Sequence, residues 1–382
     1  MDAPDLFIFA GEASGDLHGS HLLQHLFSLQ PALKVIGVGG PKMRSTPMTC
    51  LIPMENFQVM GFTDVLLALP NLVKQFYRIR NFILKHNPKA VVLIDYPGFN
   101  LRLARHLRKK GFSNKIIHYI APTVWAWGKE RVHTMSQTLD LLLTIFPFEK
   151  PFFDQHSSLN TRYVGNPLIS QLKNYPYHPN WQKEYSLAEG PLLALFPGSR
   201  KGDITRNLPL QIQAAKIVLK EHPSLNVAIS CAHPHLHPLI EKFTKQHGCS
   251  QATLISDKHT YDLMKAATLA FSKSGTATLE LALHSCPTIV TYELSRLNYL
   301  LAKYLFKINL PFYCIANILL QERLFPEVIG FQIDPRELAT SALPLLDASY
   351  QRYTKEASIR LRTLLSNEDA SRSAALAIHE LV

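Results

Sequence analysis

The sequence predicts an α/β protein made of two Rossmann-like domains that face one another across a cleft, with a helical tail at the C-terminus. Short apolar segments of strand length alternate with longer amphipathic segments, a pattern typical of parallel sheets covered by helices. The pattern occurs twice, before and after a Pro-rich, turn-prone segment at 165–191. The chain has 382 residues, of which 47% are hydrophobic, and this length allows two cores of ordinary size.

The first domain is predicted to span residues 1–167. Its strand candidates are rich in Val, Ile and Leu, as strands covered on both faces must be. They are residues 6–10, 34–39, 90–95, 115–121 and 141–146. Helices are predicted in the gaps between these strands.

A linker is predicted at 168–190 and a second domain at 191–343. The strand candidates of this domain are residues 192–197, 225–231, 251–256, 269–273 and 287–292. The tail, 344–382, is rich in Ala, Leu and Arg and has helical spacing without a strand signal. Ligands of open α/β sheets bind at the carboxyl ends of the strands, so functional residues are expected there.

Charge and cysteine content narrow the choice of partners. The chain carries 40 Lys and Arg against 29 Asp and Glu, a net charge of +11, which favours an anionic partner such as a nucleotide, a phospholipid surface or nucleic acid. No recognised nucleic-acid motif is present, so nucleic acid is not expected. The five cysteines are scattered and are expected to be reduced. With neither a secretory signal nor an apolar membrane helix, the expected location is the cytoplasm.

A glycine-rich turn follows the first predicted strand. It reads GEASGDLHG at 11–19 and carries the polar residues Glu12, Ser14 and Asp16. Its small residues would let backbone N–H groups and a helix N-terminus approach a phosphate or a sugar. The glycine spacing is neither that of a dinucleotide site nor that of a P-loop, and a purely structural strand-to-helix turn is an equal alternative.

Asp95 follows the buried strand at 90–94. A carboxylate at a strand's carboxyl end can face the cleft and accept a proton from a hydroxyl nucleophile. The alternative is a structural aspartate that caps the next turn. Past another predicted strand, Trp125 and Trp127 could stack on sugar rings or hold acyl chains, or could simply pack in the core.

Two turns of the second domain have features of a diphosphate site. Gly198, Ser199 and Arg200 end a predicted strand, and an arginine fork beside a helix N-terminus suits phosphate oxygens. Ser274, Gly275 and Thr276 end another strand, with Glu280 one helical turn later. That carboxylate could accept hydrogen bonds from two ribose hydroxyls while helix amides hold the phosphates, although Ser274 or Thr276 could instead cap the helix.

A basic amphipathic helix is predicted at 70–88, with a proline near each end. Lys74, Arg78 and Lys85 lie between its apolar positions. Core packing with a solvated basic face is the simpler explanation, and contact with an anionic membrane surface is the alternative.

No metal site and no cofactor are predicted. His233, His235 and His237 alternate with other residues, two of them prolines, which indicates an exposed loop rather than a metal centre. Asp-x-Asp occurs nowhere in the chain. The usual short carboxylate pair for a divalent ion on a nucleotide sugar is therefore missing, and a metal-independent mechanism is preferred.

Seven motifs, read in order, closely resemble the lipid A disaccharide synthases. They are GEASGDLHG (11–19), LIDYPGFN (93–100), HYIAPTVWAWGKERV (118–132), FPFEKPFF (146–153), YVGNPL (163–168), FPGSR (196–200) and SGTATLE (274–280). The resemblance implies a GT-B-like fold and an inverting hexosyltransferase of lipid A (lipopolysaccharide) biosynthesis. The implied substrates are UDP-2,3-diacylglucosamine and 2,3-diacylglucosamine 1-phosphate, and the products are a β-1,6-linked disaccharide 1-phosphate and UDP. It also implies peripheral association with the inner leaflet of the cytoplasmic membrane, through the 70–88 helix, and allows a homodimer.

The resemblance also assigns roles to single residues. Asp95 falls on the family's candidate base, and Glu12, Ser14 and Asp16 fall on its acceptor-side loop. The implied UDP contacts are Gly198, Ser199, Arg200, Ser274, Gly275, Thr276, Glu280 and Asn317. Gly98 stands where the family often has a second acidic residue, so any assistance from that carboxylate is absent. Ala316 replaces the proline common before the asparagine, and Gly330 replaces a common glutamine.

Two other functions fit the same residues. One is a related GT-B enzyme that uses another UDP-sugar, or a UDP-sugar epimerase. The other is a noncatalytic two-domain ligand-binding protein. The first would act on soluble rather than lipid substrates, and the second would neither hydrolyse nor transfer a UDP-sugar.

Overall fold

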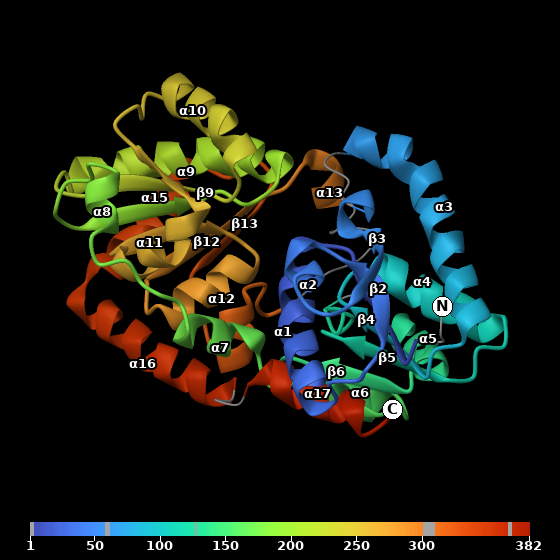
Figure 1. Cartoon of the computed structure of the whole chain (residues 1–382). Coiled ribbons are helices and arrows are strands. Elements are labelled where there is room, and N and C mark those ends of the chain that lie inside the picture. The colour runs from blue at the N-terminus through green and yellow to red at the C-terminus, as the bar shows by residue number, and fades with distance from the viewer. Residues whose placement is uncertain (1–3, 58–61, 127, 301–309, 366–368) are drawn as a thin grey trace. The chain divides into compact units, whose positions relative to one another are not determined.

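The chain forms two α/β units, each with its own parallel sheet, in the computed structural model (Figure 1). The structure describes residues 4–57, 62–126, 128–300, 310–365 and 369–382. Unit 1 comprises Met1–Asn174 and Leu365–Val382, and unit 2 comprises Tyr175–Leu364. The predicted architecture of two parallel-sheet units is confirmed.

Unit 1 contains a seven-stranded sheet in the order β3-β2-β1-β4-β5-β6-β7. The strands are β1 Leu6–Ala10, β2 Val35–Gly39, β3 Thr49–Pro53, β4 Ala90–Ile94, β5 Lys115–Tyr119, β6 Leu141–Thr144 and β7 Thr161–Tyr163. The helices are α1 Ala13–Leu29, α2 Pro41–Arg44, α3 Phe62–His86, α4 Pro97–Lys109, α5 Glu130–Thr138, α6 Glu149–His156, α7 Pro167–Lys173 and α17 Ala370–His379. All the strand pairs are parallel.

Unit 2 contains a six-stranded parallel sheet in the order β10-β9-β8-β11-β12-β13. The strands are β8 Leu192–Phe196, β9 Asn226–Cys231, β10 Thr253–Ser256, β11 Leu269–Lys273, β12 Thr288–Glu293 and β13 Glu327–Gly330. The helices are α8 Trp181–Glu184, α9 Lys201–Glu221, α10 His237–Gln246, α11 Thr260–Ala266, α12 Thr276–Leu283, α13 Arg296–Leu300, α14 Ile315–Leu320, α15 Pro335–Ala342 and α16 Ala348–Leu364.

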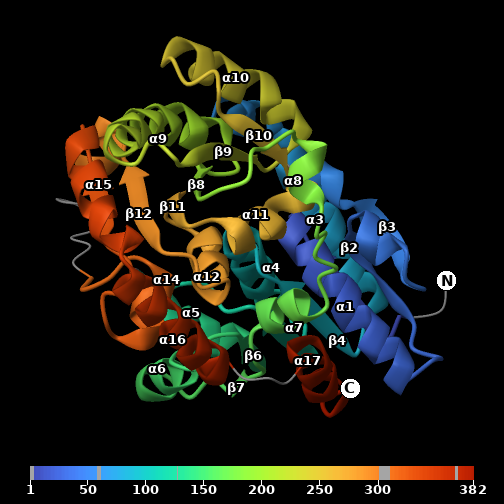
Figure 2. The same ribbon diagram turned by 90° about the vertical axis from the view of Figure 1, so that its left-hand side faces the viewer.

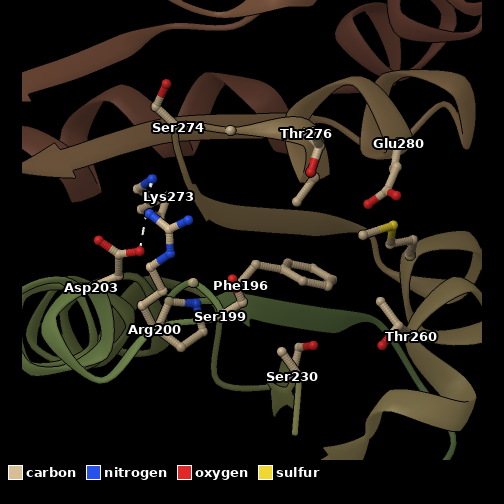
Figure 3. A pocket seen from close by; sticks show the side chains of 16 residues that line it. Phe196, Ser199, Arg200, Asp203, Ser230, Thr260, Lys273, Ser274, Thr276 and Glu280 are labelled. Carbon is tan, nitrogen blue, oxygen red and sulfur yellow. Dashed lines mark ion pairs between the residues drawn. The ribbon is translucent and has the colours of Figure 1, made fainter. Parts of the chain in front are cut away.

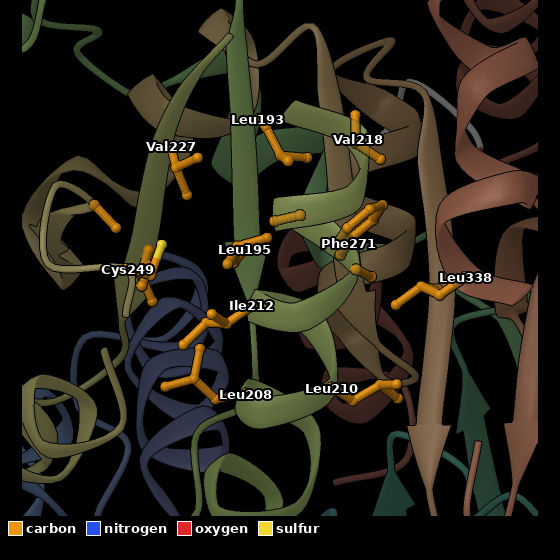
Figure 4. Packing of buried hydrophobic residues seen from close by; sticks show 14 of the residues in the cluster. Leu193, Leu195, Leu208, Leu210, Ile212, Val218, Val227, Cys249, Phe271 and Leu338 are labelled. Carbon is orange, nitrogen blue, oxygen red and sulfur yellow. The ribbon is translucent and has the colours of Figure 1, made fainter. Parts of the chain in front are cut away.

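Alternation along the strands distributes the core of unit 1 over both faces of its sheet. Leu6 and Ile8 belong to the cluster under α1 and α17, whereas Phe7 and Phe9 belong to the cluster under α3 and α4, because successive side chains of a strand point to opposite faces. In unit 2, α9 places Leu208 among the apolar side chains of β8, β9 and β11 (Figure 4).

The predicted strands are all present, but β3, β7 and β13 were not predicted. Each of the three lies at an edge of its sheet. They have three to five residues and include intermediate or exposed positions, so they lack the continuous apolar run that marks a doubly covered strand.

The C-terminal tail, expected to form one segment, is shared between the units. In unit 2, α16 lies beside α12 and α14 (Figure 2), and the Ser358 hydroxyl donates to the Leu283 carbonyl oxygen at 3.0 Å. In unit 1, α17 packs along α1 (Figure 1), and Asp369 caps α17 and pairs with His25 at 3.2 Å. Helix α7, which lies in the predicted linker except for its first residue, Pro167, also belongs to unit 1.

Helix α3 begins earlier than the sequence predicted. It runs through Pro70 rather than starting at this proline. Its buried face carries Gln75, Ile79 and Ile83, which anchor the helix on the unit 1 core. Within the described residues, no helix is both long enough and apolar enough to cross a membrane.

Glu149 is a fully buried carboxyl group at the turn from β6 into α6. Its Oε2 accepts hydrogen bonds from the backbone N–H groups of Ile145 and Phe146, at 3.2 and 3.0 Å. Burial raises the pKa of Glu149 to about 7, against the opposing effect of these two N–H groups. The folded protein therefore binds a proton more tightly at this site than the unfolded chain does.

This linkage predicts a pH-dependent stability that Glu149→Gln removes. Because the pKa is 4.5 for an ordinary glutamate and about 7 for Glu149 in the folded protein, stability falls as pH rises between these values, by about 3 kcal/mol. The glutamine amide oxygen can still accept from the turn. The free energy of unfolding, measured in urea, should therefore fall less between pH 5 and pH 8 in the variant than in the wild type. The exposed Glu189→Gln is the control, and equal losses in Glu149→Gln and the wild type would contradict this prediction.

Candidate functional site

The carboxyl edge of the unit 1 sheet brings two of the predicted residues to neighbouring strand ends. Strands β1 and β4 pair up to Ala10 and Ile94, so Glu12 and Asp95 follow adjacent strands. Asp95 and Tyr96 have φ angles of 48° and 47°, and Ile120, after β5, has a φ of 70°. Such left-handed conformations are costly for residues other than glycine and concentrate at functional sites.

Asp95 is a partly buried carboxylate with a perturbed pKa. Burial raises its pKa, and the negative charge of Glu12 raises it further. Asn100 holds the turn by donating from Nδ2 to the carbonyl oxygens of Ile94 and Asp95, at 3.2 and 2.6 Å. At Gly98, an added Cβ would meet no atom within 4 Å. A raised pKa makes a carboxylate a stronger base, which suits general base catalysis.

The glycine-rich turn divides into exposed and structural residues. Glu12 and Ser14 are exposed. Asp16 is buried, and its carboxylate accepts from the backbone N–H groups of Gly40, Lys42 and Met43 at 2.8 to 3.0 Å. Asp16 thus closes the start of α2. Both oxygens of its carboxylate accept hydrogen bonds from the backbone. Glu12 and Ser14 are therefore the accessible polar residues of the predicted acceptor-side loop.

An aromatic group lies after β5 and β6. The Trp125 ring packs edge-on against Phe148, with centroids 5.0 Å apart, and Phe146 stacks on Phe148. Trp125 is partly exposed, so it is not an ordinary core residue. Trp127 lies outside the described residues.

The turns predicted to bind a diphosphate surround a single pocket in unit 2. The pocket has a volume of about 370 Å³. Its lining includes seven residues predicted from the sequence: Gly198, Ser199, Arg200, Ser274, Gly275, Thr276 and Glu280. Figure 3 shows that they come from two strand ends and the two helices that follow them. The structure therefore brings these residues together, and their contact with UDP stays a prediction.

Two helix N-termini open onto this pocket. Helix α9 starts after Arg200 and α12 starts after Gly275, and neither start has a side-chain cap within the described structure. A capping role for Ser274 or Thr276 is thus not observed. Gly198 has a φ of 111°, and a Cβ there would lie 2.7 Å from that of Asp203, so this turn requires glycine. Uncapped amides at two helix starts form a natural anion site.

Glu280 lies in the pocket wall and is held by a tyrosine. The Tyr261 hydroxyl donates to Glu280 Oε1 at 3.1 Å. Burial raises the pKa of Glu280, and the Tyr261 hydrogen bond opposes this change. With one oxygen fixed by Tyr261, the carboxylate has a defined orientation and can accept hydrogen bonds from a ligand hydroxyl.

Nine other residues that line the pocket were not among the predicted site residues, although Phe196, Pro197 and Ala277 lie inside the quoted motifs. The nine are Phe196, Pro197, Asp203, Ser230, Ala232, Thr260, Met264, Lys273 and Ala277. Lys273 is the last residue of β11 and Asp203 lies in the first turn of α9, so both immediately adjoin predicted motifs. Ser230 and Thr260 come from segments without any motif, and only the fold brings them to the pocket.

Asn317 does not line this pocket, and its contact with UDP stays a prediction. It is fully buried, and its side chain exchanges two hydrogen bonds with the backbone of Phe325, at 2.8 and 2.9 Å. Its Nδ2 also donates to Glu327 Oε1 at 3.0 Å. These hydrogen bonds fix the chain after α14.

The histidines at 233–237 do not gather around a metal position. His233 and His235 stack with centroids 5.5 Å apart, and His237 Nδ1 lies 3.6 Å from Glu241. In the described part of the chain, no group of three or more His, Cys, Asp or Glu side chains is arranged to hold a metal ion.

The outer face of α3 exposes apolar and basic side chains together. Leu69, Val73 and Tyr77 are 50%, 45% and 45% exposed, and their spacing of four residues places them on one side of the helix. The predicted contacts Lys74, Arg78 and Lys85 are also exposed. Helix α3 thus packs on the core with one face and presents an apolar stripe with basic neighbours on another.

Comparison with known proteins agrees with these features. The model of the family described as lipid-A-disaccharide synthetase matches residues 6–381. A lipid-A-disaccharide synthase of Azotobacter vinelandii is 35% identical over 98% of this chain and 97% of its own length. A lipid-A-disaccharide synthase of Chlamydia pneumoniae is 41% identical over 89% of this chain but only 56% of its own length. The chain therefore spans less than two thirds of that chlamydial relative.

Solved structures share the fold at low sequence identity. A UDP-GlcNAc 2-epimerase from Neisseria meningitidis, bound to UDP-GlcNAc, matches 100% of both chains with a TM-score of 0.64 and 12% identity. The calicheamicin glycosyltransferase CalG4 matches 99% of this chain and 98% of its own, with a TM-score of 0.59 and 13% identity. These likenesses establish the two-domain GT-B fold. Together with the family match over nearly the whole chain, they lead to one conclusion: this chain belongs to the lipid-A-disaccharide synthetase family.

Proposed function

We propose that the chain is an inverting glycosyltransferase of lipid A biosynthesis. It joins UDP-2,3-diacylglucosamine to 2,3-diacylglucosamine 1-phosphate, and it releases a β-1,6-linked disaccharide 1-phosphate and UDP. The pocket of unit 2 carries the proposal, because two uncapped helix starts and Arg200 offer an anion site beside the oriented Glu280 carboxylate. These groups match the diphosphate and the ribose of a UDP-sugar.

Asp95 is the proposed base. It removes the proton from the acceptor's 6-hydroxyl, whose oxygen forms a bond to the donor's anomeric carbon while the bond from that carbon to the diphosphate oxygen breaks. The raised pKa of Asp95 makes its carboxylate a stronger base, which supports this role. The exposed Glu12 and Ser14 are proposed to bind the acceptor. Asp95 belongs to unit 1, and the proposed donor pocket belongs to unit 2.

Arg200 and the start of α12 are proposed to stabilise the departing diphosphate. Negative charge grows on this group as the glycosidic bond to it breaks. Preorganised cations and helix amides stabilise such charge without rearrangement in the transition state. We propose that these groups replace the divalent ion that other glycosyltransferases use.

The outer face of α3 is proposed to hold the protein on the inner leaflet of the cytoplasmic membrane. Both substrates carry acyl chains, so the enzyme must reach them at a lipid surface. The exposed stripe of Leu69, Val73 and Tyr77 can insert among the lipids, while Lys74 and Arg78 approach anionic head groups. Peripheral binding of this kind needs no membrane-spanning helix.

Product analysis tests the proposed reaction. The chain is incubated with UDP-2,3-diacylglucosamine and 2,3-diacylglucosamine 1-phosphate in EDTA, and the products are identified by mass spectrometry. We expect the tetraacyl disaccharide 1-phosphate and UDP in equal amounts. UDP with the free diacyl sugar would indicate a hydrolase, and an unchanged donor would overturn the assignment.

Asp95→Asn should lose turnover and keep donor binding. Without the base, kcat should fall about 10²- to 10⁴-fold, while UDP affinity measured by calorimetry should stay within about twofold, because Asp95 does not line the pocket of unit 2. The exposed Asp154→Asn on α6 is the matched control and should keep full activity. Loss of UDP binding in Asp95→Asn, or retained turnover, would count against this role.

Charge reversal on α3 should release the protein from anionic vesicles. The triple change of Lys74, Arg78 and Lys85 to Glu removes the basic groups and adds repulsion, so co-sedimentation with phosphatidylglycerol vesicles should drop by about tenfold or more. The exposed residues Lys183, Lys242 and Lys245 of unit 2, changed to Glu, give the same change in net charge and should leave binding intact. Equal losses for both triples would show that net charge alone decides binding.

A further inference from the structure

One end of the unit 2 pocket carries a surplus of positive charge. Lys273 Nζ lies 3.9 Å from Asp203 Oδ2, and Arg206 lies 3.5 Å from Asp203 Oδ1. Arg200 adds a third cation, and Figure 3 shows its side chain on the same side of the pocket as Lys273 and Asp203. Arg200 and Lys273 line this end of the pocket, and Arg206 pairs with Asp203 next to it. Three cations against one carboxylate leave a net positive charge, which favours a multiply charged anion.

Lys273 is held at this end in a partly dehydrated environment. It is the last residue of β11, and its ammonium lies over the Tyr292 ring at 4.6 Å from the centroid. Burial lowers the pKa of Lys273; Asp203 opposes this change, and Arg200 and Arg206 add to it. A bound anion would restore favourable interactions for the charged form. The separation of 3.9 Å from Asp203 is too long for a hydrogen bond, so the ammonium keeps capacity for a ligand.

The order of groups along the pocket indicates which phosphate Lys273 would meet. Glu280 and Thr260 lie at the opposite end from Lys273, Arg200 and Asp203 (Figure 3). If Glu280 holds the ribose, as the proposed function requires, the phosphate chain extends from there toward the cations. The phosphate farther from the ribose then reaches the Lys273 end.

We propose that Lys273 binds the β-phosphate of the donor, so that the pocket selects a nucleoside diphosphate over a monophosphate. Asp203 acts as a positioning residue that holds the ammonium toward the pocket. This inference rests on the proposed function, in which the pocket of unit 2 binds UDP. It adds a second cation beside Arg200 for the diphosphate that leaves in the reaction.

Calorimetric titration of the full chain with UDP and with UMP tests this role. In Lys273→Met, UDP affinity should fall about 10- to 100-fold, the size expected when a charge-assisted hydrogen bond is lost. UMP affinity should change by less than about threefold, so the preference for UDP over UMP collapses. Lys273→Arg should restore most of this preference, and Lys242→Met, at an exposed position of unit 2, should change neither affinity.

The outcomes separate this inference from the proposed function. If the wild type binds UDP and Lys273→Met still prefers UDP over UMP, the role of Lys273 is overturned, whereas the donor site stands. Equal losses for both nucleotides would show a structural role and would also overturn it. If the wild type binds no UDP, the donor assignment itself fails, and the inference fails with it.

Discussion

The parallel direction of the strands is the constraint on which both candidate sites depend. When all strands of a sheet run the same way, every strand-to-helix turn lies at one edge. In unit 1 this geometry places Glu12 and Asp95 after adjacent strands, and in unit 2 it places the turns after β8 and β11 around one pocket. Residues distant in the sequence become neighbours for this reason alone.

Burial gives the polar groups at these edges their chemical character. The carboxyls of Asp95, Glu149 and Glu280 all have raised pKa values, and dehydration is the main cause in each. Their surroundings nevertheless separate their roles. Glu149 accepts hydrogen bonds from two backbone N–H groups of a turn, and a tyrosine hydroxyl orients Glu280. Asp95 instead lies near the Glu12 carboxylate and the open space at Gly98.

Sequence reasoning worked where the pattern is local and failed where it depends on tertiary contacts. The buried strands and the turns at Gly198 and Ser274 were predictable, because apolar runs and small residues signal them directly. Asp16 and Asn317 are polar residues in or near such motifs, yet their side chains satisfy backbone groups 24 and 8 positions away. The motifs do not predict these hydrogen bonds, because the bonds depend on tertiary contacts. Ser230 and Thr260 carried no signal, since only the pairing of strands brings them to the pocket.

The return of the chain into unit 1 has a practical consequence for dissecting the protein. Because α17 completes the face of the sheet that α1 covers, no single cut separates the units into intact halves. A fragment ending near residue 174 would leave the apolar surface beneath Ala374 and Ile378 open to water. To obtain unit 1 alone, residues 365–382 must therefore be joined to residues 1–174 by a short artificial connector that replaces unit 2.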